Sequence, residues 1–234
     1  MKRNVLITGA TRGIGFEIAK KLAGLNYQVI GIARHEMTQQ FPGELFFADL
    51  SLTTETARVL HEITRRFDIH AVVNNVGGSS NQALGKIDLE TFEYMINYNV
   101  RSTLQVTQGV LNSMKAANWG RIINMASLAI YGVKNRSAYA AAKAALVGFT
   151  RTWALELAQF NITVNALAPG AIETELFDKM RPPGSAEEKE ILQQIPLNCL
   201  GQPSDIAAMV ALLLSEEGKF ITGQVLSIDG GASI

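Results

Sequence analysis

The sequence predicts an α/β protein with a doubly wound parallel sheet of about seven strands, covered by helices on both faces. Short apolar runs of strand length recur along the chain, and none of them alternates polar with apolar residues. Most of the segments between the runs are long enough to hold a helix. Strands that are apolar on both sides belong in a parallel sheet covered on both faces, and parallel strands require such crossover segments.

The seven predicted strands lie, in chain order, at residues 5–7, 29–33, 45–48, 71–73, 122–125, 163–168 and 225–228. After the first strand, Ile14, Ile18 and Leu22 recur at helical spacing. A second helix is predicted at about 138–159, where charges are few and small or apolar residues dominate. We expect this helix to be buried on several sides, either by core packing within the chain or by a partner subunit.

Composition excludes several classes of protein. The 234 residues carry 21 Lys plus Arg and 21 Asp plus Glu, so the net charge is zero and a nucleic-acid binder is not expected. A single cysteine, Cys199, excludes a disulfide framework and fits a reducing compartment, and we expect its thiol to be packed. The apolar run at 5–7 is too short for a signal peptide, and 206–214 is too short to cross a membrane. We therefore expect one cytoplasmic domain spanning 1–234.

A glycine-rich segment follows the first strand and enters a helix. It reads Thr-Gly-Ala-Thr-Arg-Gly-Ile-Gly over residues 8–15. Glycines allow a tight turn and close backbone approach, and the helix N-terminal amides can then hold a pyrophosphate. The pattern predicts a dinucleotide site, with an ordinary strand-to-helix turn as the alternative.

The end of the second strand indicates which nicotinamide cofactor binds. An acid there accepts from free ribose hydroxyls, whereas a cation receives a 2′-phosphate. The strand ends at Arg34, Glu36 lies beyond it, and a second cation, Arg12, stands in the glycine loop. This arrangement predicts NADP(H), unless Arg34 is only a solvated loop residue.

Tyr139 and Lys143 are four residues apart, on one face of the second predicted helix. A tyrosine with a pKa of about 10 transfers protons poorly at neutral pH. A lysine roughly 5 Å away, at an effective dielectric of about 20, would lower that pKa by about two. The pair therefore predicts a phenol that acts as an acid or a base.

With these motifs the chain resembles the short-chain dehydrogenase/reductase family over nearly its whole length, which implies a Rossmann-like fold. The motifs that carry the resemblance are the glycine loop, Asp49-Leu50, Asn74-Asn75-Val76-Gly77, Asn99, Ser127, Tyr139 with Lys143, and Pro169-Gly170 with Ile172 and Thr174. Two departures are Val76, where the family usually has alanine, and Ser127, which lies 12 residues before Tyr139 where many relatives have 13.

The resemblance implies four catalytic residues. Tyr139 would donate a proton to a carbonyl in reduction and act as the base in oxidation. Lys143 would lower the tyrosine pKa and hold the nicotinamide ribose, Ser127 would position the carbonyl oxygen, and Asn99 would support a water chain that resupplies the proton.

The resemblance also implies a cofactor-binding set. Asp49 and Leu50 would contact the adenine region, and Ile172 with Thr174 would contact the nicotinamide amide and the phosphates. The full set is Gly9, Arg12, Gly13, Ile14, Gly15, Arg34, Asp49, Leu50, Asn75, Val76, Gly77, Tyr139, Lys143, Pro169, Gly170, Ile172 and Thr174. No metal site is expected, because the three histidines show no ligand spacing.

Within the family, the glycine loop and the C-terminal Ile-Thr-Gly-Gln and Asp-Gly-Gly motifs resemble those of 3-oxoacyl-[acyl-carrier-protein] and acetoacetyl-coenzyme A reductases. We therefore expect NADPH-dependent reduction of a ketone, with a 3-oxoacyl thioester as the substrate class that this resemblance favours, although the short connection at 35–43 weakens the link to fatty-acid synthesis. Alternatives are NAD(P)-dependent oxidation of a secondary alcohol or sugar, and a module that senses NADP(H) without chemistry. We expect a substrate lid at about 173–198, where apolar residues either contact substrate or only pack the lid down. The family resemblance implies a homotetramer or homodimer.

Overall fold

The computed structural model describes residues 2–37 and 39–234 and confirms the predicted fold class. In this part of the chain, seven parallel strands form one sheet in the order β3-β2-β1-β4-β5-β6-β7. Every predicted strand is present. The strands are β1 (Asn4–Thr8), β2 (Gln28–Ala33), β3 (Glu44–Phe47), β4 (Ala71–Asn74), β5 (Gly120–Met125), β6 (Ile162–Pro169) and β7 (Val225–Ile228).

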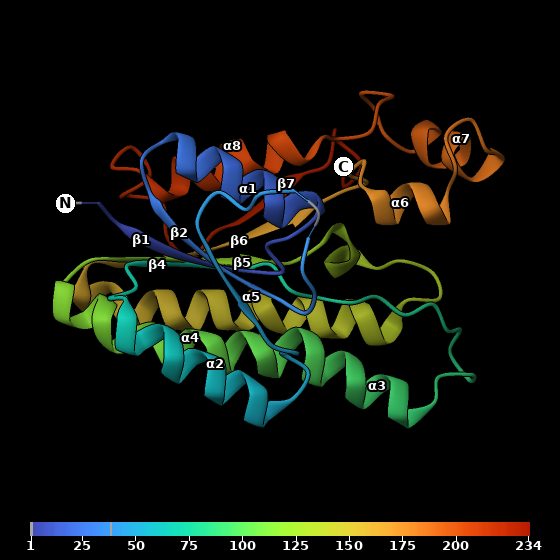
Figure 1. Cartoon of the computed structure of the whole chain (residues 1–234). Coiled ribbons are helices and arrows are strands. Elements are labelled where there is room, and N and C mark those ends of the chain that lie inside the picture. Colours follow the sequence, from blue (N-terminus) through green and yellow to red (C-terminus); the bar gives the residue numbers. More distant parts are fainter. Residues whose placement is uncertain (1, 38) are drawn as a thin grey trace.

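Helices cover both faces of the sheet (Figure 1). On one face lie α1 (Gly13–Gly24) and α8 (Pro203–Leu214). On the other lie α2 (Thr53–Arg66), α4 (Ser102–Ala117) and α5 (Ser137–Leu157), with α3 (Leu89–Ile96) joined to α4 through a π-helical turn, η1 (Asn97–Arg101). The remaining helical segments are η2 (Leu128–Tyr131), η3 (Ala158–Phe160), α6 (Glu175–Met180) and α7 (Ala186–Gln193).

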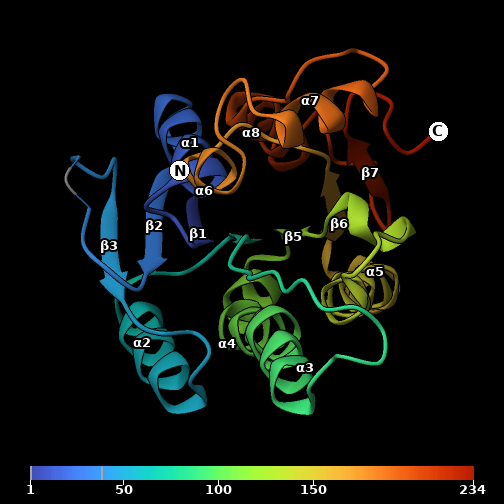
Figure 2. The same ribbon diagram turned by 90° about the vertical axis from the view of Figure 1, so that its right-hand side faces the viewer.

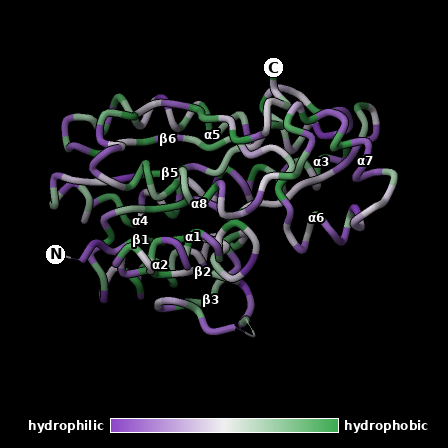
Figure 3. Tube along the Cα trace, turned by 90° about the horizontal axis from the view of Figure 1, so that it is seen from above, coloured by the Kyte–Doolittle hydropathy of each residue, from purple (hydrophilic) through white to green (hydrophobic). Residues whose placement is uncertain are grey.

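Strand β1 shows why its sequence is apolar throughout. Val5 and Ile7 pack into the cluster that includes α1 and α8, whereas Leu6 between them packs into the cluster that includes α2, α4 and α5. All three are fully buried. Because neighbouring strand residues point to opposite faces, burial on both faces requires a continuous apolar run. In Figure 3 hydrophobic residues accordingly follow the central strands β5 and β6, and hydrophilic residues gather around α7.

The sheet order reverses between β1 and β4, where β2 and β3 continue to one side and β5 to β7 to the other. In open α/β sheets ligands bind beyond the carboxyl ends of the strands at such a reversal. Figure 2 looks onto this edge, where α6 and α7, from the segment expected to be a lid, lie above and α3 and α4 lie below. The fold therefore brings the predicted site motifs to one end of the sheet.

The expected packing of the Cys199 thiol was wrong, and so was burial of α5 on several sides by its own chain, whereas burial of α5 by a partner subunit stays a prediction. Helix α5 packs only one side onto the sheet, since Ala144 and Arg151 are exposed and Leu155 is 84% exposed. A helix that flanks a sheet has one face to bury within its own chain, so its other apolar residues remain uncovered. Cys199 is also exposed rather than packed, because its segment turns between α7 and α8 at the surface.

Candidate active site

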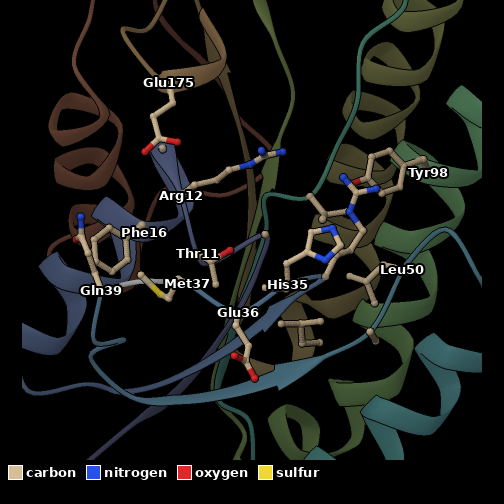
Figure 4. A pocket seen from close by; sticks show the side chains of 17 residues that line it. Thr11, Arg12, Phe16, His35, Glu36, Met37, Gln39, Leu50, Tyr98 and Glu175 are labelled. Atoms are coloured by element: carbon tan, nitrogen blue, oxygen red, sulfur yellow. The ribbon is translucent and has the colours of Figure 1, made fainter. Parts of the chain in front are cut away.

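A cavity of about 460 Å³ opens at the carboxyl ends of β1 and β2, and its size suits a nucleotide. Figure 4 shows Arg12 and Glu175 on one side of it and Tyr98 and Leu50 on the other. Predicted cofactor residues supply part of its lining, namely Gly9, Arg12, Gly13, Arg34, Leu50 and Val76.

The glycine loop at the entrance of α1 needs glycine for steric reasons. Gly9 and Gly13 adopt positive φ values of 65° and 50°. A Cβ on Gly15 would lie 2.2 Å from the Gly9 carbonyl oxygen and 2.7 Å from Nδ2 of Asn75. The first turn of α1 therefore packs directly against the preceding turn, and its amides point outward as a dinucleotide pyrophosphate requires. These residues fit a dinucleotide.

Asn75 holds the glycine loop in place. Its backbone N–H donates to Oγ1 of Thr8 at 3.0 Å, and its Nδ2 donates to the carbonyl oxygens of Thr8 at 3.0 Å and Gly9 at 3.2 Å. Its neighbour Val76 lines the cavity. Asn75 thus shapes the cavity through the loop.

The adenine-side loop after β3 is also fixed by hydrogen bonds. Oδ1 of Asp49 accepts from the N–H of Ser51 at 2.8 Å, so this oxygen is used within its own turn. Nη2 of Arg101 donates to the carbonyl oxygens of Leu50 at 2.9 Å and Ser51 at 2.6 Å. Leu50 is 2% exposed and lines the cavity.

Arg34 reaches across the cavity toward a residue that the sequence analysis did not identify. Its Cζ lies 5.5 Å from the ring centroid of Tyr98, which is 6% exposed and stacks on Tyr94. In the described residues no carboxylate lies within 4 Å of either Arg34 or Arg12. Both guanidinium groups therefore remain available to phosphate.

The segment after β6 closes the other side of the glycine loop. The N–H of Gly170 donates to the carbonyl oxygen of Ile228 at 2.9 Å, which continues the β6–β7 pairing beyond Pro169. Thr174 caps α6, and its Cγ2 would lie 3.3 Å from a Cβ on Gly13. In contrast, Ile14 and Ile172 belong to the core cluster under α1 and α8 and do not line the cavity.

The predicted catalytic residues meet at the ends of β4 and β5. Ser127 follows β5 and accepts the N–H of Ala129 at 3.2 Å, so it caps η2. The Ser127 side chain lies close enough to the phenol of Tyr139, in the first turn of α5, to lower the pKa of that phenol. One residue fewer in the connecting loop therefore does not separate the two hydroxyl groups.

Lys143 and Asn99 lie on either side of Gly77. Nζ of the fully buried Lys143 donates to the carbonyl oxygen of Met125 at 2.7 Å. The side chain of Asn99 accepts from the N–H of Gly78 and donates to the carbonyl oxygens of Gly78 and Met95. A Cβ on Gly77 would lie 2.7 Å from Oδ1 of Asn99 and 2.9 Å from Nζ of Lys143. Only glycine allows these polar groups to come so close.

The expected effect of Lys143 on the tyrosine pKa is not what this structure shows. Burial raises the pKa of Tyr139 above its ordinary value, and the nearby Ser127 side chain and the charge of Arg136 only partly oppose that rise. Burial also lowers the pKa of Lys143 to about 8, which weakens it as a permanent cation. Sequence spacing gave the proximity of the two groups but not their desolvation, which is the larger effect here.

Three residues near the site were missed by sequence reasoning, namely Tyr98, Glu175 and Arg136. Tyr98 and Asn99 are consecutive, and in a regular helix they would point about 100° apart. Both lie in the π-helical turn η1, and no sequence signal announces such a turn. Arg136 could have been found, because it stands three residues before Tyr139, close to the same helix face.

Searches for two other kinds of site gave negative results within residues 2–37 and 39–234. No group of three or more His, Cys, Asp or Glu side chains is arranged to bind a metal ion. No helix there combines the length and the apolar character that a membrane span requires.

Comparisons with known proteins agree with this geometry. A family model described as Enoyl-(Acyl carrier protein) reductase matches residues 9–233. The 3-oxoacyl-[acyl-carrier-protein] reductase FabG of Thermotoga maritima is 36% identical over 241 residues, covering 98% of this chain and 97% of the relative. The solved structure of ElxO with NADP bound has a TM-score of 0.92 at 31% identity and covers 99% of both chains. A short chain dehydrogenase family protein from Francisella tularensis has a TM-score of 0.90 at 28% identity, over 100% of this chain and 99% of that one.

Proposed function

Because the chain belongs to the short-chain dehydrogenase/reductase family of oxidoreductases, we propose that it uses NADPH to reduce a ketone to a secondary alcohol. The observation that carries the proposal is the proximity of the Tyr139 phenol to the Ser127 hydroxyl, with Lys143 one helical turn from Tyr139. Two hydroxyl groups at one point can hold a carbonyl oxygen and supply it with a proton. A module that only senses the cofactor has no need of that pair.

NADPH is proposed in preference to NADH because the cavity presents Arg12 and Arg34 to the ribose end of the cofactor. Each guanidinium can make charge-assisted hydrogen bonds to a 2′-phosphate. The similarity to a protein solved with NADP bound supports this choice. The glycine loop and Thr174 would hold the pyrophosphate, and Lys143 would hold the nicotinamide ribose.

In the proposed reaction the protein supplies geometry and a proton. NADPH, when bound, supplies the hydride. Ser127 orients the ketone oxygen and Tyr139 donates its phenolic proton to that oxygen as negative charge develops there. Lys143 and Asn99, both buried, would maintain the polar path through which the phenol regains a proton.

A 3-oxoacyl thioester is the substrate class that the name of the Thermotoga maritima relative suggests. We propose that residues 173–198, which contain α6 and α7, act as a lid over that substrate within a single domain spanning 1–234. We also propose a homodimer or homotetramer, because Leu155 and its exposed neighbours leave an apolar side of α5 uncovered. Sedimentation equilibrium of the purified protein measures that assembly directly.

NADPH oxidation by the purified protein tests the function. The substrates are an acetoacetyl thioester and a panel of small ketones, and the controls are NADH and a crotonyl thioester, which offers a carbon–carbon double bond but no ketone. We expect turnover of ketones with NADPH. Turnover of the crotonyl thioester alone would show that the protein reduces enoyl groups and not ketones. Binding of NADPH with no turnover of any compound would favour a module that senses the cofactor without chemistry.

A further inference from the structure

Two cations flank the ring of Tyr139 at nearly equal distances. Nζ of Lys143 lies 5.9 Å from the ring centroid, and Cζ of Arg136 lies 6.0 Å from it. Lys143 is 4% exposed and bonded to a backbone carbonyl, whereas Arg136 is only half-buried. Arg136 is therefore the cation that a substrate arriving from solvent can reach.

Among the described residues, no ion pair and no helix-capping interaction accounts for the position of Arg136. It is the N-cap residue of α5, and a positive charge at a helix N-terminus is unfavourable because it opposes the helix dipole. Within the described chain no carboxylate lies within 4 Å of its guanidinium. Its side chain donates a hydrogen bond to Oγ of Ser79 at 3.2 Å, which aims it at the loop after β4.

The two loops on this side of Tyr139 contain no acidic residue. Residues 76–87 and 126–137 include Lys86, Lys134 and Arg136 but no Asp or Glu. The loops are joined, because the N–H of Gln82 donates to the carbonyl oxygen of Asn135 at 2.7 Å. The next acid along the chain, Asp88, is already bound by Thr91 and Gln82. The local charge beside Tyr139 is therefore positive and not neutralised.

We propose that Arg136 binds a carboxylate of the substrate, beside the ketone oxygen that Tyr139 protonates. The planar fork of an arginine matches a carboxylate with two parallel hydrogen bonds. Since Cζ of Arg136 lies 6.0 Å from the centroid of the ring that carries the phenol, a small oxo acid at the phenol can extend its carboxylate toward the guanidinium. The inference rests on the proposed ketone reduction. Among ketone substrates it favours 2-oxo or 3-oxo acids over a neutral 3-oxoacyl thioester.

The test compares ketones that differ only in charge. Acetoacetate and 2-oxobutanoate are each paired with their methyl esters, and kcat/KM is measured with NADPH. The variants are Arg136→Gln, which removes the charge, and Arg136→Lys, which keeps the charge and loses the fork. Lys134→Gln is the matched control, because it removes an exposed charge two residues away in the same loop. Binding is also measured by calorimetry with NADP⁺ present, since the oxidised cofactor has no hydride to give.

We expect the wild type to favour at least one acid over its ester by about tenfold or more, in both kcat/KM and affinity. Arg136→Gln should abolish that preference by lowering acid turnover far more than ester turnover, while Lys134→Gln should keep the preference. Arg136→Lys should retain part of it. Ester turnover that persists in the variants also shows that they are folded.

The contrary results are distinct. Equal binding of acid and ester by the wild type would overturn the inference. So would a loss of preference in Lys134→Gln as large as that in Arg136→Gln, because the general positive charge of the loop, and not Arg136, would then attract the acid. A parallel loss of acid and ester turnover in Arg136→Gln would also overturn it, because Arg136 would then serve Tyr139 and not the substrate. If the acids bind as expected but no ketone is reduced, the arginine site stands and the proposed reaction falls.

Discussion

The guanidinium of Arg34 lies 5.5 Å from the ring centroid of Tyr98, across the cavity that the glycine loop borders. The two residues come from the end of β2 and from the π-helical turn η1, far apart in sequence. A cation held against an aromatic face in a partly enclosed site loses little further freedom when it binds an anion. The pair therefore prepares Arg34 for a phosphate.

Arg34→Ala should weaken NADPH binding by about one to two decades and change NADH binding little, because charge-assisted hydrogen bonds contribute roughly 1.5 to 3 kcal/mol. Tyr98→Leu should cause a smaller loss in the same direction, since the charge remains but its support is gone. Tyr98→Phe, which keeps the ring, serves as the matched control. Fluorescence titration measures each Kd, and equal losses for both cofactors would contradict the assignment of Arg34 to a 2′-phosphate.

Gly15→Ala should remove cofactor binding and destabilise the protein, because its Cβ would lie 2.2 Å from the Gly9 carbonyl oxygen and must displace backbone. Gly24→Ala, at the other end of α1, is the control. No atom lies within 4 Å of a Cβ there, so a stability change within about 1 kcal/mol and unchanged binding are expected. Thermal unfolding and NADPH titration measure both effects. Wild-type affinity in Gly15→Ala would refute the close packing of the glycine loop.

The buried Lys143 predicts a specific pH dependence of stability. Burial lowers its pKa to about 8, whereas in the unfolded chain the pKa is near 10.4. Between these values the unfolded chain binds more protons, so the free energy of unfolding contributed by Lys143 rises as pH increases. Below about pH 8 both states are protonated and the contribution is constant.

Denaturant unfolding of the wild type and of Lys143→Met between pH 7 and 10 tests this. The stability of the wild type relative to the variant should increase over that range, by an amount on the order of 2 kcal/mol. Above about pH 10 the raised pKa values of Tyr98 and Tyr139 act in the opposite direction, because the folded state then keeps protons that the unfolded state loses. Parallel pH profiles of the two proteins would show that the Lys143 pKa is not lowered.

Much of the fold was predictable because each strand of a doubly covered parallel sheet must be apolar on both sides, as Val5, Leu6 and Ile7 are. The meeting of Ser127 with Tyr139 was predictable in outline because loops after parallel strands gather at one edge. The approach of Arg34 to Tyr98 was not, since no motif in the sequence placed Tyr98 beside the cavity. The raised pKa of Tyr139 was not either, because spacing along a helix reveals nearby charges but not how far the site excludes water.

The exposed side of α5 shows a different limit. The sequence of that helix indicates that apolar surface must be covered, and Leu155 confirms that the chain alone leaves some uncovered. Neither pattern nor fold specifies the covering partner. Likewise Ile172 lies in the core and Ile14 packs against it, although both stand within motifs of the expected cofactor site, so their contact with the cofactor stays a prediction.

Tyr139→Phe tests the central claim most directly, because it removes one oxygen atom and leaves the ring in place. The reductase activity found with the ketone panel is measured beside the Kd for NADPH. The proposed proton transfer predicts a loss of turnover of about 10²-fold or more, with NADPH binding within about threefold of wild type. Wild-type turnover in Tyr139→Phe would contradict the assignment of Tyr139 as the proton donor.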